Sequence, residues 1–196
     1  MNIRVLVEIF IIYYLPVSLI LIGILDFGNR FVYLVLVGLL VIFISKLKRL
    51  SFFDLGLRPR SLKADLVLNA LLSLIFILFF VSAYCLGLIG RKYVPQDVMF
   101  YIFYVFISCP LQEFLYRGYF FSLLNKANII KSSHRIFLSA LSFSYLHSIY
   151  LDFFTLVVTF AIGALWSYIY QKTNSIYGVC LSHIVFGTVT ILAGLV

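Results

Sequence analysis

The sequence has little charge, and acidic residues are the minority of what charge it has. Only 11% of the 196 residues are charged, and 7 Asp and Glu face 15 Lys and Arg. This composition excludes a soluble domain, because 64% of the residues are hydrophobic and the mean hydropathy is +1.13. The sequence therefore predicts an integral membrane protein of one domain.

Cysteine is also scarce, and the three cysteines form no pattern. Cys85, Cys109 and Cys180 fall in apolar stretches, are odd in number and lack the spacing of metal ligands. We interpret them as buried thiols, which excludes a disulfide framework. No Ala-x-Ala cleavage site follows the apolar N-terminal run, so we expect a retained first span and no cleaved signal peptide.

Long apolar runs dominate what is present. A helix needs about 20 apolar residues to cross a bilayer. Seven runs approach that length: 5–25, 31–45, 65–90, 98–125, 136–151, 153–170 and 175–196. The second and fifth are short, and we expect the fifth to bend or to stop before the far face. Without strand alternation or a clear repeat, the pattern predicts an all-α fold, a polytopic membrane helix bundle of about seven transmembrane helices. Residues 1–50 are expected to form an N-terminal transmembrane hairpin.

The basic residues lie in short links between the apolar runs. The positive-inside tendency places the link after the second run in the cytoplasm, because it holds Lys46, Lys48, Arg49, Arg58, Arg60 and Lys63. Alternation from there puts eleven basic residues inside and only Arg30, Arg91 and Lys92 outside, with a cytoplasmic N-terminus and an external C-terminus. The net charge of +8 suits the lipid bilayer as partner, and we expect no nucleic acid. Segment 51–60 is either an interfacial segment or a solvated loop.

Four ionisable residues interrupt the later apolar runs. Glu113 and Arg117 are four residues apart on one helix face, and His147 and His183 lie in two further runs. At about 1.5 Å per residue, Glu113, His147 and His183 each lie roughly 16–20 Å from the cytoplasmic end of a helix. A charge at mid-membrane is costly when it faces lipid. We therefore expect the three to face one another around a polar cavity.

Each of these residues also has a structural interpretation. Glu113 and Arg117 alone can form a self-neutralising pair that joins helices, and a single histidine in a span is often only a hydrogen-bonding core residue. Together, a carboxylate and two imidazoles are the groups needed to activate and steer water. Pro110 favours a kink beside them. Among other polar residues, Asp65 is expected to reach the interface, and Asn69 to bond across helices.

Three motifs follow one another on separate predicted helices. Residues 112–118 read Gln-Glu-Phe-Leu-Tyr-Arg-Gly, residues 143–147 read Phe-Ser-Tyr-Leu-His, and residues 183–187 read His-Ile-Val-Phe-Gly. They resemble the Glu-Glu-x-x-x-Arg, Phe-x-x-x-His and His-x-x-x-Asn motifs of the CPBP family of CAAX-processing and bacteriocin-processing intramembrane proteases, also called Abi. The resemblance runs from about residue 54 to 187. It implies that residues 51–196 form a CPBP-like protease core whose site opens within the membrane.

The resemblance also implies roles. In the family, the first Glu of the pair and the His of the second motif activate a water molecule. The last His and the Asn hold the oxyanion, and the second Glu and the Arg support the site. Two positions of this sequence depart from the pattern, because Gln112 replaces the first Glu and Gly187 replaces the Asn. A carboxamide is no general base, and a lost oxyanion donor costs about 100- to 1000-fold in rate.

The expected function is that of an intramembrane endopeptidase, a hydrolase acting on a membrane-anchored protein or peptide. Glu113 is the expected base, His147 orients the water, and His183 stabilises developing charge. Gln112 assists by hydrogen bonding, and Arg117 sets the charge and position of Glu113. No cofactor and no metal are expected, since the spacing carries no metal signature. The resemblance points to a multi-pass protein of a bacterial cell membrane.

Two alternatives remain open. The departures at Gln112 and Gly187 favour a catalytically inactive CPBP-like scaffold or immunity protein. Buried charges also suit a small transporter, although the lack of a visible repeat disfavours it.

Overall fold

The computed structural model of the chain describes residues 3–87, 94–128 and 131–194. Within these ranges it contains helices and no strand, in seven continuous helical segments. The first three segments are α1 (Ile3–Ile9) with α2 (Leu15–Leu21), α3 (Arg30–Leu47) and α4 (Leu62–Cys85). The fourth joins α5 (Val98–Phe103), α6 (Cys109–Glu113) and α7 (Phe120–Lys126). The last three are α8 (Ser132–Leu146), α9 (Phe153–Thr173) and α10 (Tyr177–Leu192).

The all-helical membrane fold is confirmed. Five segments of the described chain are long and apolar enough to cross a bilayer: Ile3–Leu21, Phe27–Leu47, Leu62–Cys85, Val98–Lys126 and Phe153–Thr173. Helix α10 is a shorter apolar helix. The second segment is longer than its apolar run, because a helical turn at Phe27–Asn29, capped by the Asp26 side chain, precedes α3. The fifth is short as expected: α8 gives way to a 3-10 turn at His147–Tyr150, and Leu151 then takes a left-handed conformation.

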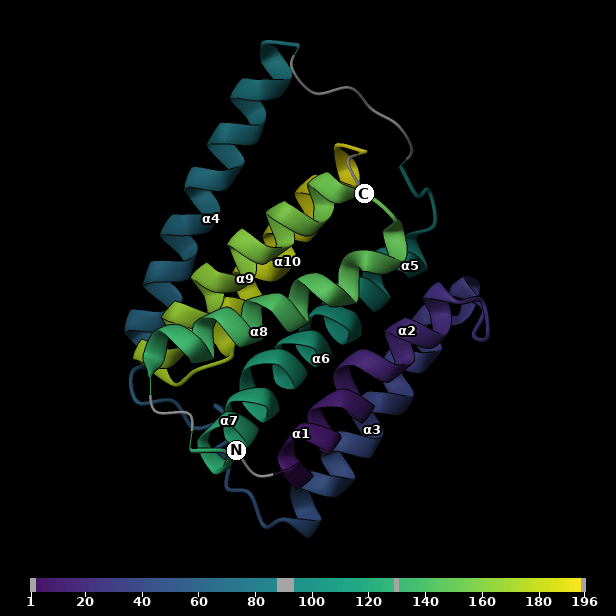
Figure 1. Cartoon of the computed structure of the whole chain (residues 1–196). Coiled ribbons are helices and arrows are strands. Elements are labelled where there is room, and N and C mark those ends of the chain that lie inside the picture. Colours follow the sequence, from purple (N-terminus) through teal and green to yellow (C-terminus); the bar gives the residue numbers. More distant parts are fainter. Residues whose placement is uncertain (1–2, 88–93, 129–130, 195–196) are drawn as a thin grey trace.

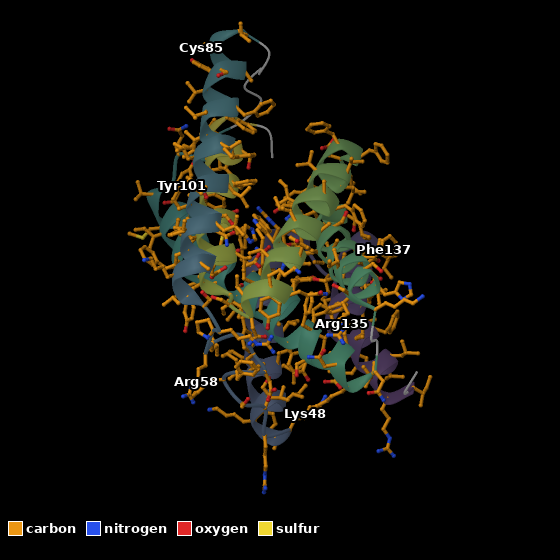
Figure 2. The ribbon with its side chains drawn as sticks, turned by 90° about the vertical axis from the view of Figure 1, so that its left-hand side faces the viewer. Lys48, Arg58, Cys85, Tyr101, Arg135 and Phe137 are labelled. Carbon is orange, nitrogen blue, oxygen red and sulfur yellow. The ribbon has the colours of Figure 1, made fainter. Side chains whose placement is uncertain are left out.

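The segments form one bundle with α4 at one edge and α1 to α3 at the opposite edge (Figure 1). Lys48 and Arg58 lie at one end of the molecule, and Cys85 lies at the other (Figure 2). This polarity suits the expected topology, which remains a prediction because Arg91 and Lys92 lie outside the described residues. The cysteines are free, but only Cys109 is buried. The expectation of a buried thiol is wrong for Cys85, which is exposed at the end of α4.

A buried polar seam joins α4 to the start of α10. The expectation that Asp65 reaches the interface is wrong, since Asp65 is fully buried. Its Oδ2 accepts hydrogen bonds of 2.6 Å from both the Ser175 hydroxyl and the Gly178 backbone N–H. Ser182 donates to Asn69 across 2.8 Å, so Asn69 does bond across helices. A Cβ at Gly178 would lie 2.5 Å from Asp65 Cγ, which is why glycine stands at this crossing.

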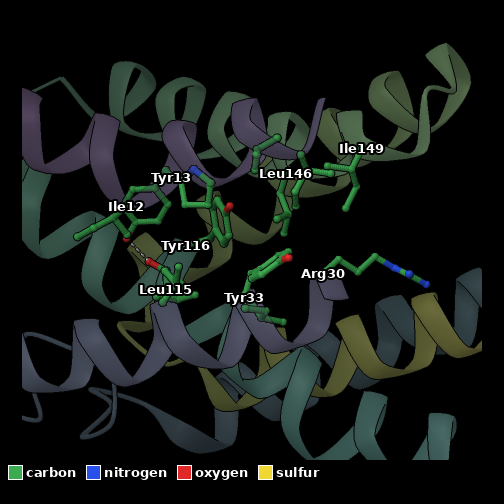
Figure 3. Close-up of a pocket in the computed structure, with 13 residues that line it drawn as sticks. Ile12, Tyr13, Arg30, Tyr33, Leu115, Tyr116, Leu146 and Ile149 are labelled. Carbon is green, nitrogen blue, oxygen red and sulfur yellow. Dashed lines mark hydrogen bonds between the residues drawn. The ribbon is translucent and has the colours of Figure 1, made fainter. Parts of the chain in front are cut away.

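The N-terminal segments pack on α6 to α8 through tyrosine side chains. The Tyr13 hydroxyl donates to the Leu115 carbonyl across 2.7 Å, and Tyr14 is 2.9 Å from the Ser142 hydroxyl. A small cavity of about 50 Å³ lies at this junction, and Tyr13, Tyr33, Tyr116 and Leu146 are among the residues that line it (Figure 3). The division into an N-terminal hairpin and a protease core remains a prediction. These contacts fix the segment that carries α5 to α7, on which the candidate site is built.

Candidate functional site

The segment Val98–Lys126 departs from regular α-helix on both sides of α6. A π-helical turn occupies Tyr104–Ser108 before it, and another occupies Phe114–Tyr119 after it. Pro110, in the first turn of α6, has no N–H to donate to an earlier carbonyl, which accounts for irregular bonding where a kink was expected. Such π-helical turns are frequent at functional sites because they re-aim side chains.

Glu113, at the end of α6, is fully buried. Its Oε1 accepts hydrogen bonds from Arg117 Nη1 at 3.0 Å and from His183 Nδ1 at 2.6 Å. Among the described residues, no group forms a hydrogen bond to Oε2. The carboxylate therefore joins its own helix to α10 through a single oxygen.

Arg117 is held on every side by protein. Its guanidinium is fully buried and donates from Nη2 to the Gly163 carbonyl at 3.4 Å. Its Cζ lies 4.3 Å from the Phe143 ring centroid and 5.3 Å from that of Trp166, which adds cation–π attraction. A Cβ at Gly163 would lie 3.1 Å from Phe143 Cδ1, so the glycine admits the close approach of α8 and α9. Arg117 thus balances the charge of Glu113 from a rigid position.

The two histidines contact the same phenylalanine ring. Ring centroids are 4.8 Å apart for Phe143 and His147, and 5.5 Å for Phe143 and His183. His147 Nδ1 is 2.9 Å from the Phe143 carbonyl. A carbonyl only accepts, so Nδ1 carries the hydrogen, and the lone pair is on Nε2. His183 also stacks on Trp166, at 4.7 Å and 27°, which fixes the plane of its ring.

Gln112 and Glu113 are neighbours with different surroundings. Gln112 donates from Nε2 to the Ser108 hydroxyl at 2.9 Å, and its Oε1 has no partner among the described residues. Gln112 lines a large cavity, whereas Glu113 does not. Adjacent helical residues differ by about 100° in direction, which explains why only one of the two reaches the cavity.

The cavity has a volume of about 1050 Å³ and is bounded by α4, the α5–α6 region, α8, α9 and α10. Its polar groups include Gln112, His147 and His183. Most of its wall is aromatic or aliphatic, with Phe76, Phe79, Phe80, Phe100, Phe154, Ile162 and Phe186 among the lining residues. The expected site residues therefore lie together in two layers: an amide and two imidazoles at the cavity, with Glu113 and Arg117 behind them.

Two neighbours of the site were not singled out by the sequence. Trp166 supports His183 and faces Arg117, yet a single tryptophan in an apolar run carries no signal. Tyr104 lines the cavity, and its ring centroid is 6.4 Å from that of His183. The one indication in the sequence that another bulky group lies beside position 187 is Gly187 itself, because the family motif has Asn there.

Comparison with known families covers the same part of the chain. Residues 94–189 match the model of a family described as Rce1-like, type II CAAX prenyl endopeptidase. No curated protein and no solved structure gave a match. The matched range begins before α5 and ends within α10, so it contains Gln112, Glu113, Arg117, His147 and His183 but not the part of the cavity wall that α4 provides. Over residues 94–189, just under half of its length, the chain is therefore similar to the Rce1-like family of type II CAAX prenyl endopeptidases, which are proteases.

Proposed function

We propose that the chain is an intramembrane endopeptidase that hydrolyses a peptide bond of a membrane-anchored protein or peptide. The observation that carries this proposal is the arrangement of Gln112, His147 and His183 on the wall of one apolar cavity. The Glu113 carboxylate, bonded to His183 from behind, supports it. A water molecule in this cavity meets an amide and two imidazoles, which are groups able to orient it and to accept its proton.

His147 is the group that we assign as the proton acceptor. Its Nδ1–H donates to the Phe143 carbonyl, so Nε2 is free to accept a proton. The sequence alone favoured Glu113 for this task and gave His147 the orientation of the water; our proposal moves the proton acceptor to His147. Glu113 has no exposed surface, and its Oε1 already accepts two hydrogen bonds. An imidazole on the cavity wall is therefore better placed than this carboxylate to touch water.

In the proposed reaction, His147 Nε2 takes a proton from water while the water oxygen attacks the peptide carbonyl carbon. The unpaired Oε1 of Gln112 accepts a hydrogen bond from the second O–H of that water. His183 acts as the imidazolium: its Nδ1–H donates to Glu113, which holds the ring, and its Nε2–H donates to the oxyanion. The carbon–nitrogen bond then breaks, and His147 returns its proton to the leaving amine. Glu113 and Arg117 act through His183 and are positioning residues.

The cavity suits a substrate with a large apolar part. Its volume of about 1050 Å³ is slightly above the range for ligand pockets, about 300–1,000 Å³. Phe76 and Phe186 stack at 3.7 Å on its wall, one from α4 and one from α10. The family name refers to prenylated CAAX proteins. A farnesylated peptide with a CAAX C-terminus is therefore the first substrate to test.

Purified protein in detergent micelles, assayed with a quenched fluorescent farnesylated CAAX peptide, tests the proposal. His147→Gln and His183→Gln are expected to lose cleavage. His134→Gln is a matched control, because His134 is exposed at the start of α8 and lies outside the cavity. Equal cleavage by the parent, Glu113→Ala and His147→Ala would contradict the proposed mechanism.

A non-catalytic membrane scaffold is the second candidate function. The observation that favours it is the uncharged amide of Gln112 at the cavity, where the family motif has a carboxylate. If the parent cleaves no peptide and Gln112→Glu gains cleavage, the chain is an inactive relative that keeps the architecture of the site.

A further inference from the structure

The Tyr104 side chain fills the space that any side chain at position 187 would need. A Cβ built on Gly187 would overlap the Tyr104 hydroxyl oxygen and lie 2.6 Å from Cζ and 3.0 Å from Cε1 of the same ring. These atoms belong to a rigid aromatic ring, so the overlap cannot be relieved by a small bend of a flexible chain. The phenol of Tyr104 therefore lies directly against the backbone of α10 at Gly187.

This place is one helical turn beyond His183 on the same face of α10. Residues four apart on a helix are neighbours, so the Tyr104 hydroxyl reaches the surface next to the His183 imidazole. The rings of Tyr104 and His183 meet at 80° with centroids 6.4 Å apart. Tyr104, His183 and Gly187 all line the large cavity. A hydroxyl from α5–α6 thus stands beside the imidazole that we assign to the oxyanion.

The position of Tyr104 is fixed by its helix and its neighbours. It opens the π-helical turn Tyr104–Ser108, and its ring lies nearly parallel to that of Phe100, with centroids 6.2 Å apart.

We propose that the Tyr104 hydroxyl is the second oxyanion donor of this site and stands in for the side chain missing at Gly187. The inference rests on the proposed function. As the water oxygen adds to the peptide carbonyl, the carbonyl oxygen gains negative charge and accepts hydrogen bonds from the Tyr104 O–H and from His183. No proton leaves the phenol in this step. The donor has moved from α10 to the neighbouring segment, and Gly187 is the residue that admits it.

The geometric half of the proposal is tested without any assay of activity. Gly187→Ala is expected to lower the melting temperature of the purified protein when Tyr104 is present, because the new Cβ overlaps the phenol. In a Tyr104→Ala background, the same substitution is expected to have little effect. An equal effect of Gly187→Ala in both backgrounds would overturn the proposed packing.

The chemical half is tested with the farnesylated CAAX peptide. Tyr104→Phe removes one oxygen and is expected to lower kcat about 100- to 1000-fold with little change in KM, as for other lost oxyanion donors. Tyr101→Phe is the matched control, because Tyr101 lies on the outer side of the same segment (Figure 2) and bonds the Pro95 carbonyl. Tyr104→Ala combined with Gly187→Asn is expected to recover cleavage relative to Tyr104→Ala, because it returns a donor to the same place.

The outcomes separate this inference from the function on which it rests. A parent that cleaves and a Tyr104→Phe variant that cleaves equally fast overturn the role of Tyr104 and leave the protease intact. A parent that fails to cleave the peptide in every condition overturns both. A loss in Tyr104→Phe that appears wholly in KM assigns the hydroxyl to substrate binding and also overturns the oxyanion role.

Discussion

The Nδ1 atom of His183 lies 2.6 Å from Oε1 of Glu113, which joins α10 to the end of α6 inside the bundle. Arg117 donates to the same oxygen, so one buried carboxylate balances a guanidinium and orients an imidazole. The ion pair of Glu113 and Arg117 is therefore joined directly to His183, which lines the cavity. Changes to Glu113 are therefore expected to affect both stability and chemistry, and the two effects have to be separated.

Removing only one partner of the buried pair is expected to be far worse than removing both. Arg117→Met leaves an unbalanced buried carboxylate and should lower the free energy of unfolding by about 3–5 kcal/mol. Glu113→Gln combined with Arg117→Met should cost much less than the sum of the two single changes, because no uncompensated charge remains. Thermal unfolding in detergent micelles measures each variant.

The pair of Glu8 and Lys48 is the matched control for that experiment. It is also an ion pair between a carboxylate and a cation, but its side chains are 19% and 28% exposed. Lys48→Met is therefore expected to cost at most about 1 kcal/mol. Losses of equal size at Lys48 and Arg117 would contradict the account of Glu113 as a buried, charge-balanced anchor.

The seam at Asp65 should hold the start of α10 in place. Asp65→Leu strands the Ser175 hydroxyl and the Gly178 N–H, and each stranded buried group costs about 1–3 kcal/mol. Because His183 follows on the same helix, lower catalysis is expected together with lower stability. Asp54→Ala is the control, since Asp54 is exposed and only caps a local turn at Ser51. An Asp65→Leu variant as stable as Asp54→Ala would show that the polar seam does not stabilise the fold.

A carboxylate at position 112 should change an active enzyme only modestly. Gln112→Glu is expected to alter kcat by less than about tenfold, or about 1.4 kcal/mol of barrier, because His147 already accepts the proton. Gln112→Leu should slow cleavage more, since it removes the amide oxygen proposed to orient the water. The pair of variants is compared in the same peptide assay. A large gain in Gln112→Glu from an inactive parent would instead favour the scaffold.

Restoring the family residue at position 187 by Gly187→Asn also requires a substitution at Tyr104. The sequence alone suggests that Asn at this position restores the family pattern. The phenol of Tyr104 occupies that space, so Gly187→Asn by itself is expected to disturb the packing of α10.

The proposed topology can be checked with thiols. Cys85 is exposed at the end of the molecule opposite Arg58 (Figure 2). In intact cells, a membrane-impermeant maleimide is expected to label Cys85 from outside. A cysteine placed by Arg58→Cys in a Cys85→Ser background should be labelled only after the membrane is opened. The reverse pattern would place the basic link outside.

Composition and periodicity were enough to predict the helical membrane bundle, whereas the depth of Glu113, His147 and His183 in the bilayer stays a prediction. Those properties depend on one helix at a time, through apolar length and rise per residue. The burial of Asp65 could not be predicted this way. Its hydrogen-bond donors are Ser175 and Gly178, more than a hundred positions later in the chain. The sequence around Asp65 does not indicate them.

The division of work between Gln112 and Glu113 also depends on packing between helices. The sequence places both on α6, but which of them reaches the cavity depends on how α6 is rotated between its two π-helical turns. The same holds for Tyr104, which meets Gly187 only because α5–α6 and α10 pack closely. The spacing of residues along one segment predicts their depth in the bilayer, but it does not predict how two helices pack against each other.

Cleavage of the farnesylated CAAX peptide by the parent, His147→Gln and His134→Gln shows whether His147 is the proton acceptor of a peptidase. The parent and His134→Gln are expected to cut the peptide at similar rates, and His147→Gln, folded to the same melting temperature, is expected to be at least about 100-fold slower. Equal rates for all three proteins, or no cleavage by any of them, would contradict that assignment.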